Sequence, residues 1–130
     1  YRQTYPYANL KSMSQSFQPG DYLVFQLEAG FALLRVLSID ESGEDLVWHI
    51  AAYDDFYLDV EMAEASIEVE TPRTSRPHIA LTNRAFESTQ VAKILNKPLT
   101  EVEIQPLINW KNDPNRETYD RSVRLMLGLR

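Results

Sequence analysis

Acidic side chains are the most numerous chemically active groups in the sequence, and they gather in its middle. Between Val36 and Pro72 no Lys or Arg occurs. Carboxylates on adjacent turns are the ligands that Ca²⁺ prefers, so one hypothesis is a divalent-cation site. Their spacing does not match an EF-hand loop, and a solvated acidic surface is the alternative. The acids of this window are Asp40, Glu41, Glu44, Asp45, Asp54, Asp55, Asp59, Glu61, Glu64, Glu68 and Glu70.

Aromatic side chains stand among these acids, where an apolar stretch of the chain ends. Ring faces attract cations, and large rings anchor protein partners, so rings beside carboxylates favour the binding of a basic partner. The alternative is that the rings fill the core at the end of a sheet. The binding hypothesis includes Trp48, Tyr53, Asp54, Asp55, Phe56, Tyr57, Asp59 and Glu61.

His49 and His78 are the two histidines of the chain. With a carboxylate they could form an acid–base group or a metal site. Nothing in their spacing brings them together, because no H-x-H or H-E-x-x-H pattern occurs. The structural alternative is that His49 is a hydrogen-bonded, half-buried side chain within a strand and that His78 begins another strand.

Other motifs give little support to catalysis. The chain has no Cys and no G-x-S-x-G motif, and its four glycines are too scattered to form a phosphate-binding loop. The sequence therefore predicts no catalytic residues, no set of metal ligands and no cofactor. An enzyme with a histidine acid–base group remains as the third hypothesis, after a binding module and a cation-binding protein.

Arginines recur near the C-terminal end, at Arg116, Arg121, Arg124 and Arg130. On a helix Arg121 and Arg124, three residues apart, would face the same way. They could bind a phosphate or an acidic partner. Alternatively, they form the charged outer face of a helix or pair with the acidic middle of the chain.

Three β-rich segments at 22–27, 31–39 and 46–53 would position the acids and His49. Gly30 and the polar run 40–45 supply turns between them, which predicts an antiparallel meander. Alternation places Leu34 and Val36 on one face of the second strand and Ile39 on the other. Because both faces are largely apolar, we expect the sheet to curl into a small barrel or to be covered by helices on its second face.

The chain between the third strand and residue 82 gives mixed signals. Residues 54–57 are expected to leave the sheet. Residues 59–66 favour a short helix with Asp59 as its N-cap, and 67–70 alternate like an edge strand. The prolines of 71–77 predict a loop, and 78–82 predict a returning strand.

The remainder of the chain has helical signals. Ser88 is a candidate N-cap for a helix over 89–95, and Thr100 with Glu103 forms a capping box for the next helix. Pro106 is expected to bend or shorten that helix. Asp113 and Pro114 predict the start of a last helix, which would close at Gly128.

The order of strands followed by helices predicts an α+β fold rather than an α/β fold. The expected sheet is curved and antiparallel, with about four or five strands, and an SH3-like open barrel is one form it could take. At 130 residues the chain is expected to form one domain. It would comprise an irregular arm (1–18), a mostly β part (19–82) and a mostly helical part (83–130).

A non-enzymatic binding module is the leading functional hypothesis. The acids and rings of the middle segment would be offered to a basic protein partner, steered by charge. The formal net charge of −6 disfavours a general nucleic-acid binder, and no apolar run is long enough to cross a membrane. The lack of Cys favours a reducing, cytoplasmic location. Small acidic domains of this composition occur among toxin-neutralising immunity proteins and adaptors, an analogy of composition only.

Overall fold

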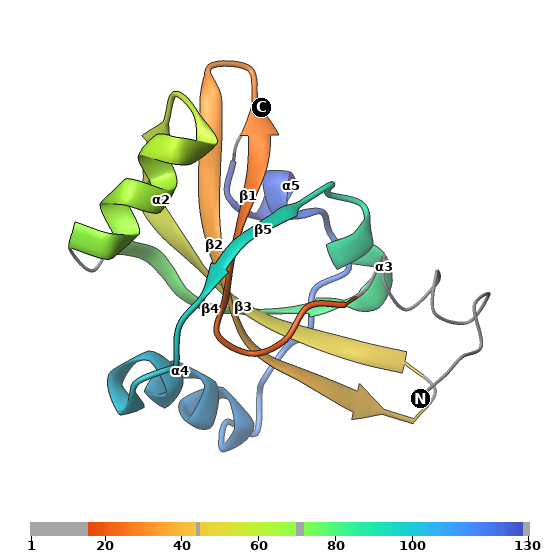
Figure 1. Cartoon of the computed structure of the whole chain (residues 1–130). Coiled ribbons are helices and arrows are strands. Elements are labelled where there is room, and N and C mark those ends of the chain that lie inside the picture. Colours follow the sequence, from red (N-terminus) through yellow and green to blue (C-terminus); the bar gives the residue numbers. More distant parts are fainter. Residues whose placement is uncertain (1–15, 44, 70–71, 129–130) are drawn as a thin grey trace, which may run out of the picture.

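The computed structural model of the protein describes residues 16–43, 45–69 and 72–128 (Figure 1). Its strands pair antiparallel in one sheet, in the order β4-β3-β2-β1-β5. The strands are β1 (Asp21–Leu27), β2 (Gly30–Ser42), β3 (Asp45–Tyr57), β4 (Thr74–Thr82) and β5 (Ala92–Asn96). The helices are α2 (Val60–Val69), α3 (Asn83–Glu87), α4 (Glu101–Lys111) and α5 (Val123–Met126).

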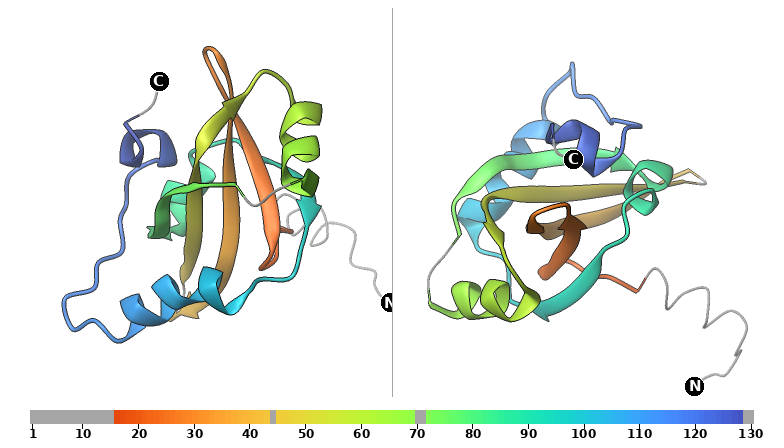
Figure 2. Two further views of the ribbon diagram at one scale, coloured as in Figure 1. Left: turned by 90° about the vertical axis from the view of Figure 1, so that its left-hand side faces the viewer. Right: turned by 90° about the horizontal axis from the view of Figure 1, so that it is seen from above.

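The predicted antiparallel meander of three strands is confirmed. β1 and β2 are joined by a two-residue turn, because Leu27 pairs with Gly30. Gly30 is required there by close packing, since a Cβ at this position would lie 2.6 Å from the Tyr57 carbonyl oxygen. The turn predicted at 40–45 is shorter than expected, because β2 continues to Ser42 and β3 begins at Asp45, so Asp40 and Glu41 lie in the strand. The fold is α+β with a curved sheet that does not close (Figures 1 and 2).

Both faces of the sheet carry apolar side chains that pack against helices. On one face the cluster includes Leu23, Trp48 and Ile50 with Phe86 of α3 and Val123 of α5. On the other face, Tyr22, Val24, Leu33, Tyr53 and Tyr57 pack with Ala63 and Ile67 of α2, and Leu37 and Ala51 pack with Leu107 of α4. Figure 2 shows α2 and α5 on opposite sides of the sheet. This double burial explains why the strands lack a clean apolar–polar alternation.

A β-bulge changes the predicted face of Ile39. The register between β2 and β3 shifts between Val36 and Ser38, so one residue is added to β2 without a partner on β3. Such a residue reverses the alternation beyond it. Ile39 therefore packs with the cluster of Leu34 and Val36, not with Leu33 on the opposite face as the sequence predicted.

The prediction that residues 54–57 leave the sheet is wrong. β3 continues to Tyr57, because Phe56 and Tyr57 pair with Ala32 and Phe31 on β2. β4 also begins earlier than predicted, at Thr74 inside the expected loop. Pro77 is tolerated in this edge strand because the β3–β4 register shifts between the pairs Ile50–Ile79 and Ala52–Arg76.

The short helix predicted at 59–66 is confirmed and is longer than expected. The backbone N–H of Met62 donates to Asp59 Oδ1 over 2.8 Å, as expected for an N-cap. The helix continues to Val69, so the predicted edge strand at 67–70 is wrong as far as Val69, and Glu70 lies outside the described residues. Ile67 is buried against Tyr22 and Tyr57, and this packing favours one more helical turn over an exposed strand.

The helix predicted at 89–95 is also wrong, because β5 occupies Ala92–Asn96. Its residues pair with β1 from Asp21 to Val24, and Ile94 and Leu95 pack beside the cluster of Tyr22 and Val24. Ser88 follows the short helix α3 as its C-cap, whereas Thr82 is the N-cap of that helix. Pairing with a distant strand thus overrides the local helical pattern of this segment.

The capping box at the start of α4 is confirmed. The Thr100 hydroxyl accepts from the Glu103 N–H over 3.2 Å, and a Glu103 carboxylate oxygen accepts from the Thr100 N–H over 2.9 Å. Pro106 does not shorten the helix, which runs on to Lys111. The helix predicted from Asp113 is wrong, since only Val123–Met126 is helical there, with Ser122 as the N-cap and Gly128 just beyond the end. Tyr119 instead forms a parallel bridge to Leu81 on the edge of β4.

We expect Thr100→Ala to lower the free energy of unfolding by about 1 kcal/mol, because it removes one half of the capping box. Urea denaturation monitored by circular dichroism measures the change. Thr118→Ala is the matched control, since Thr118 is exposed and caps no helix. An equal effect of the two substitutions would contradict a role of the Thr100 hydroxyl in the stability of α4.

The predicted irregular arm (1–18) falls mostly outside the described residues; 16–18 have no regular secondary structure. Phe17 packs edge-on against Trp48 and Phe86, with ring centroids 6.2 and 6.0 Å apart. No helix of the described part is long and apolar enough to span a membrane.

Candidate functional site

Three of the four aromatic residues predicted to bind a partner lie in the core. Trp48 is fully buried, stacks on Phe86 with the ring centroids 3.9 Å apart, and donates from Nε1 to Asn83 Oδ1 over 2.8 Å. Tyr53 and Tyr57 are buried on the other face of the sheet, against Ala63 and Ile67 of α2. Continuation of β3 through the predicted exit explains this, because alternate side chains of a strand point inward.

The remaining predicted residues are exposed and lie close together in the chain. Asp54, Asp55 and Phe56 end β3, and Asp59 and Glu61 begin α2. Between and beside them are two large apolar side chains that the sequence analysis did not single out, Leu58 and Met62. We call these seven residues the acidic–apolar surface: Asp54, Asp55, Phe56, Leu58, Asp59, Glu61 and Met62.

The apolar members of the acidic–apolar surface are strongly exposed. Phe56, Leu58 and Met62 have exposed fractions of 55%, 75% and 49%. The alternation of a β-strand could have identified Phe56 as exposed. Neighbouring side chains of a strand point to opposite faces, and Tyr57, the next residue, is buried. Leu58 gives no such signal, because it belongs to the turn between β3 and α2, where exposure depends on the tertiary structure.

A small pocket adjoins this surface. It has a volume of about 260 Å³ and is lined by Asp54 and Phe56, by Arg76 of β4, and by Met126 and Leu127 near α5. Asp54 also forms an ion pair with Arg73, with 3.6 Å between Oδ2 and Nε. Both side chains of this pair are exposed, so it contributes little and can be displaced by a partner.

The two histidines lie together, which their spacing did not predict. Asp40 on β2, His49 on β3 and His78 on β4 form a hydrogen-bonded chain across the sheet. His49 Nδ1 lies 2.9 Å from His78 Nε2, and His49 Nε2 lies 3.0 Å from Asp40 Oδ2. Antiparallel pairing brings His49 opposite Ala80. His78 is two residues from Ala80 on the same face of β4, so it is the diagonal neighbour of His49.

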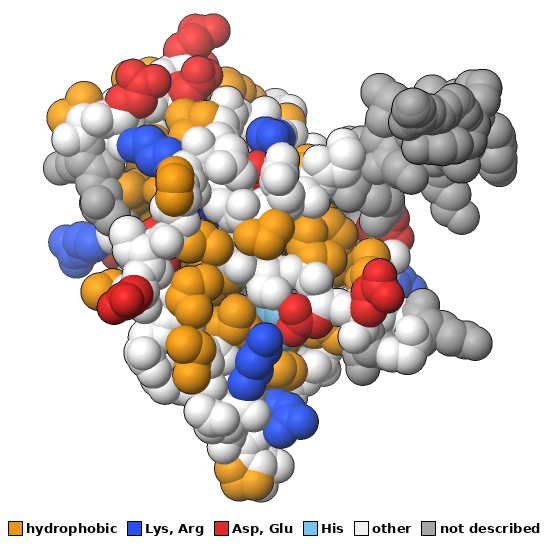
Figure 3. Space-filling view, turned by 60° about the horizontal axis from the view of Figure 1, so that its bottom comes forward, with side chains coloured by type: hydrophobic (Ala, Val, Ile, Leu, Met, Phe, Trp, Pro, Cys, Tyr) orange, Lys and Arg blue, Asp and Glu red, His pale blue; other side chains and the backbone are white. Residues whose placement is uncertain are grey.

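The protonation of this chain follows from its acceptors. An ionised carboxylate only accepts hydrogen bonds, so His49 Nε2 carries a hydrogen and His49 Nδ1 is an acceptor. His78 must then donate from Nε2 to His49. Trp110 of α4 packs beside both rings, with centroid distances of 4.9 Å to His49 and 5.6 Å to His78. Figure 3 shows a histidine reaching the surface between an acidic and a basic side chain.

Burial controls the charges of this chain. It lowers the pKa of His78 to about 4, with a smaller contribution from the neighbouring His49. Burial also lowers the pKa of His49, and only partial compensation comes from Asp40. Burial acts to raise the pKa of Asp40, but the hydrogen bond from Ser38 and the neighbouring His49 and Lys111 together lower it. The histidines are therefore neutral and Asp40 is ionised at neutral pH.

The described acids and histidines do not form a metal centre. Among residues 16–43, 45–69 and 72–128 no group of three or more His, Asp or Glu could hold a metal ion. In the histidine chain His49 Nδ1 and His78 Nε2 are hydrogen-bonded to each other. Asp40 also pairs with Lys111, with 3.6 Å between Oδ2 and Nζ. Of the predicted calcium ligands at 40–45, Glu44 lies outside the described residues.

The C-terminal arginines have separate surroundings. Arg116 lies over the Trp110 ring, with Cζ 5.6 Å from its centroid. Arg124 donates from its guanidinium to the carbonyl oxygen of Gln26, whereas Arg121 is exposed. Arg130 lies outside the described residues.

Comparison with protein-family models, with curated proteins and with solved structures gives no match for this chain. The function is therefore inferred from the geometry alone.

Proposed function

We propose that the protein is a non-enzymatic binding module whose acidic–apolar surface binds a basic protein partner. The observation that carries this proposal is the exposure of Phe56, Leu58 and Met62 in the same short stretch as four carboxylates. Exposed apolar side chains bordered by charges are typical of interaction sites. The negative net charge also disfavours nucleic acid as the partner.

The chemistry of a suitable partner follows from the pocket beside Phe56. Lysine and arginine have apolar stems and cationic heads, so their stems can pack on apolar walls while their heads meet carboxylates. Phe56, Met126 and Leu127 supply such walls, and Asp54 supplies a carboxylate. The Phe56 ring adds attraction for a cation. Charge then steers the encounter, and the apolar contacts slow dissociation.

For the scaffold we propose an SH3-like open barrel with helices covering both faces. The order β4-β3-β2-β1-β5 supports it, because the last strand returns to pair with the first. Helix contacts on the two faces support the covering. The lack of Cys supports a reducing, cytoplasmic compartment for the interaction.

Charge reversal tests the proposed function. We expect the triple substitution of Asp54, Asp55 and Asp59 by Lys to slow association with a basic peptide, Ac-Lys-Leu-Arg-Leu-Lys-amide, by about tenfold or more at low salt. Stopped-flow fluorescence with a dye-labelled peptide measures the rate. Amide NMR should map the peptide to residues 54–62 of the unmodified protein and to Arg76, Met126 and Leu127 of the pocket beside Phe56.

The control variant has the same change in net charge, but at a different part of the surface. Glu101, Asp113 and Glu117 are exposed acids of the C-terminal part, and their replacement by Lys should reduce the rate much less. All six positions are exposed, so circular dichroism should find both variants folded. Loss of the Asp59 N-cap should cost the first variant about 1 kcal/mol of stability. Equal rates for the two variants, or peptide shifts away from both 54–62 and the pocket beside Phe56, would rule out the acidic–apolar surface as the binding site.

A further inference from the structure

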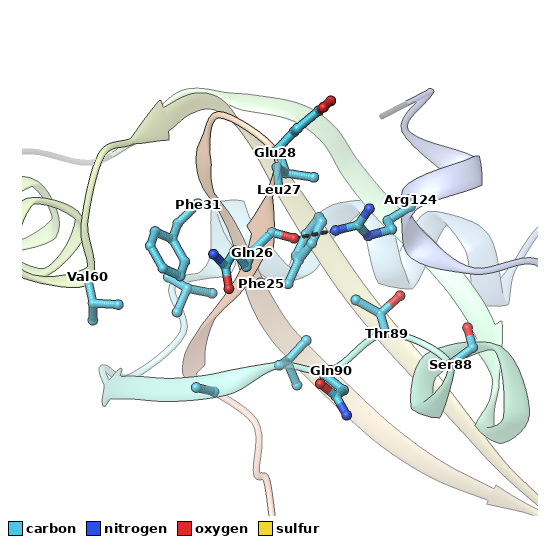
Figure 4. Close-up of a pocket in the computed structure, with 13 residues that line it drawn as sticks. Phe25, Gln26, Leu27, Glu28, Phe31, Val60, Ser88, Thr89, Gln90 and Arg124 are labelled. Carbon is cyan, nitrogen blue, oxygen red and sulfur yellow. Dashed lines mark hydrogen bonds between the residues drawn. The ribbon is translucent and has the colours of Figure 1, made fainter. Parts of the chain in front are cut away.

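A second, larger pocket lies at the other end of the sheet, away from the histidine chain. Its volume is about 1000 Å³, and it lies between the β1–β2 hairpin, the segment that connects α3 to β5, and α5 (Figure 4). The acidic–apolar surface does not contribute to its lining. The inference below is therefore independent of the proposed function.

The pocket exists because β5 separates from β1. The pairing of these strands ends at Val24 and Ala92, whereas β1 continues to Leu27. Beyond this point the segment from Ser88 to Val91 turns away toward α3, and a space opens beside Gln26. Arg124 crosses part of this space to reach the Gln26 carbonyl oxygen (Figure 4).

One end of the pocket carries a positive charge that is not neutralised. Arg124 forms no ion pair with any carboxylate of the described residues, and its guanidinium donates to the neutral Gln26 carbonyl. Glu28 also lines the pocket, but Figure 4 shows its carboxylate directed away at the rim. A guanidinium has five N–H donors, so donors remain for an anionic group.

A buried hydroxyl without a partner lies at the same end. Thr89 is only 6% exposed, and its Oγ1 has no hydrogen-bond partner in the part of the chain that the structure describes. Thr89 lines the pocket at the end where Arg124 lies (Figure 4). A buried polar group without a partner is costly, so this hydroxyl favours a partner other than the described residues.

The opposite end of the pocket is apolar. Phe31 and Val60 form its wall, and Phe25 lines it beneath (Figure 4). The pocket thus offers a cation and a hydroxyl at one end and aromatic and aliphatic carbon at the other. Binding sites for small molecules commonly combine apolar walls with a few polar groups that fix orientation.

We propose that this pocket binds a small amphipathic carboxylate. The carboxylate accepts hydrogen bonds from the Arg124 guanidinium and the Thr89 hydroxyl, and the apolar body of the ligand lies against Phe31 and Val60. Arginine and carboxylate form strong charge-assisted hydrogen bonds because the planar guanidinium matches both oxygens. The amide side chains of Gln26 and Gln90 are available for polar groups along the body of the ligand.

A titration with 3-phenylpropionate, followed by two-dimensional amide NMR, tests this proposal. We expect saturable shifts confined to residues 24–31, 60, 88–92 and 124. The neutral 3-phenylpropanamide has the same shape and should bind about tenfold more weakly, because a charge-assisted hydrogen bond is lost. N-acetyl-alanyl-phenylalanine, in the same titration, separates a free organic acid from a peptide C-terminus: tighter binding of the dipeptide would assign the same carboxylate site to chain ends.

Two variants test the two polar groups. Arg124→Gln should weaken binding of 3-phenylpropionate about tenfold, whereas Arg121→Gln, at an exposed arginine outside the pocket, should not. Thr89→Val has nearly the same shape and removes only the hydroxyl. It should weaken binding about threefold while leaving the melting temperature unchanged or higher, because no hydrogen bond to another described residue is lost.

Several results would overturn the proposal. Shifts that do not saturate, or that spread outside the pocket, would show that the carboxylate binds nonspecifically. Equal binding of the amide would show that Arg124 does not recognise charge. A stabilised Thr89→Val variant with unchanged affinity would make the hydroxyl an unused buried group and remove the argument for a ligand.

Discussion

Replacing Arg35 by alanine is expected to lower the free energy of unfolding by about 3–5 kcal/mol, the range for breaking a buried ion pair from one side. Arg35 is 1% exposed on β2 and forms an ion pair with Glu103 of α4 over 3.2 Å. Its guanidinium also donates to the carbonyl oxygens of Gly20 and Pro98, over 3.1 and 3.2 Å. One side chain therefore joins the sheet, the turn before β1 and the start of α4.

The loss should be large because several groups lose their partners together. Glu103 is also the acid of the α4 capping box, and it would lose its cation. The Tyr22 ring, whose centroid lies 4.0 Å from Arg35 Cζ, would lose a packed cation. Two carbonyl oxygens would lose a donor, and a buried acceptor without a partner is unfavourable.

Chemical denaturation of wild type and Arg35→Ala at pH 7 measures this effect. Arg84→Ala is the matched control, because Arg84 pairs with Asp120 where both side chains are exposed, and its removal should cost far less. Arg35→Met, which keeps much of the apolar stem, should recover part of the loss. A loss below about 1 kcal/mol for Arg35→Ala would contradict its role in holding α4 to the sheet.

Acidification from pH 7 to pH 4 is expected to cost the protein roughly 3 kcal/mol through His78 alone. Burial lowers the pKa of His78 from 6.5 to about 4 in the folded state. Between these values the unfolded chain binds a proton that the folded protein excludes. Stability is therefore full above about pH 6.5 and falls as the pH drops toward 4.

Neighbouring groups act in the same window or below it. The lowered pKa of His49 adds to the loss in the same direction. Asp40, with its pKa lowered from 3.8, stabilises the fold above that value and loses this contribution only at lower pH. Lys111 is a further charged group beside the chain, with 3.6 Å between its Nζ and Asp40 Oδ2. The loss of stability expected between pH 6.5 and pH 4 is therefore due to the two histidines.

The variant His78→Gln isolates the contribution of His78. Its amide can donate to His49 Nδ1 but cannot gain a proton, so its stability should fall much less between pH 7 and pH 4. Urea denaturation at each pH gives the stability, and NMR of the ring carbons follows the protonation of the histidines. A His78 ring that titrates near pH 6.5, or identical pH profiles for wild type and variant, would contradict the buried histidine chain.

The part of the fold that depends on local residue patterns could be predicted from the sequence. The first three strands and their turns, the N-cap of α2 at Asp59 and the capping box of α4 are confirmed. Each depends on residues within a few positions of one another, so turn chemistry and capping were sufficient to identify them. The acids at the end of β3 were also correctly expected at the surface.

The errors lie where distant segments meet. Residues 92–96 have a helical pattern, but pairing with β1 makes them a strand. Residues 54–57 were expected to leave the sheet, but pairing with β2 continues the strand. That continuation buries Tyr53 and Tyr57 and leaves Phe56 exposed, which changes the anchors available on the acidic–apolar surface. A sheet register is set by all its strands together, and no single segment determines it.

The sequence by itself determined the charge of the middle segment, the meander and the helix caps at Asp59 and Thr100, because composition, turn residues and capping residues act locally. Only the tertiary structure decided that His49 and His78 meet, that Arg35 binds Glu103, and that Thr89 and Arg124 share a pocket. These pairs are separated by tens of residues along the chain. Their distances depend on strand pairing and bulges, which arise from packing of the whole molecule.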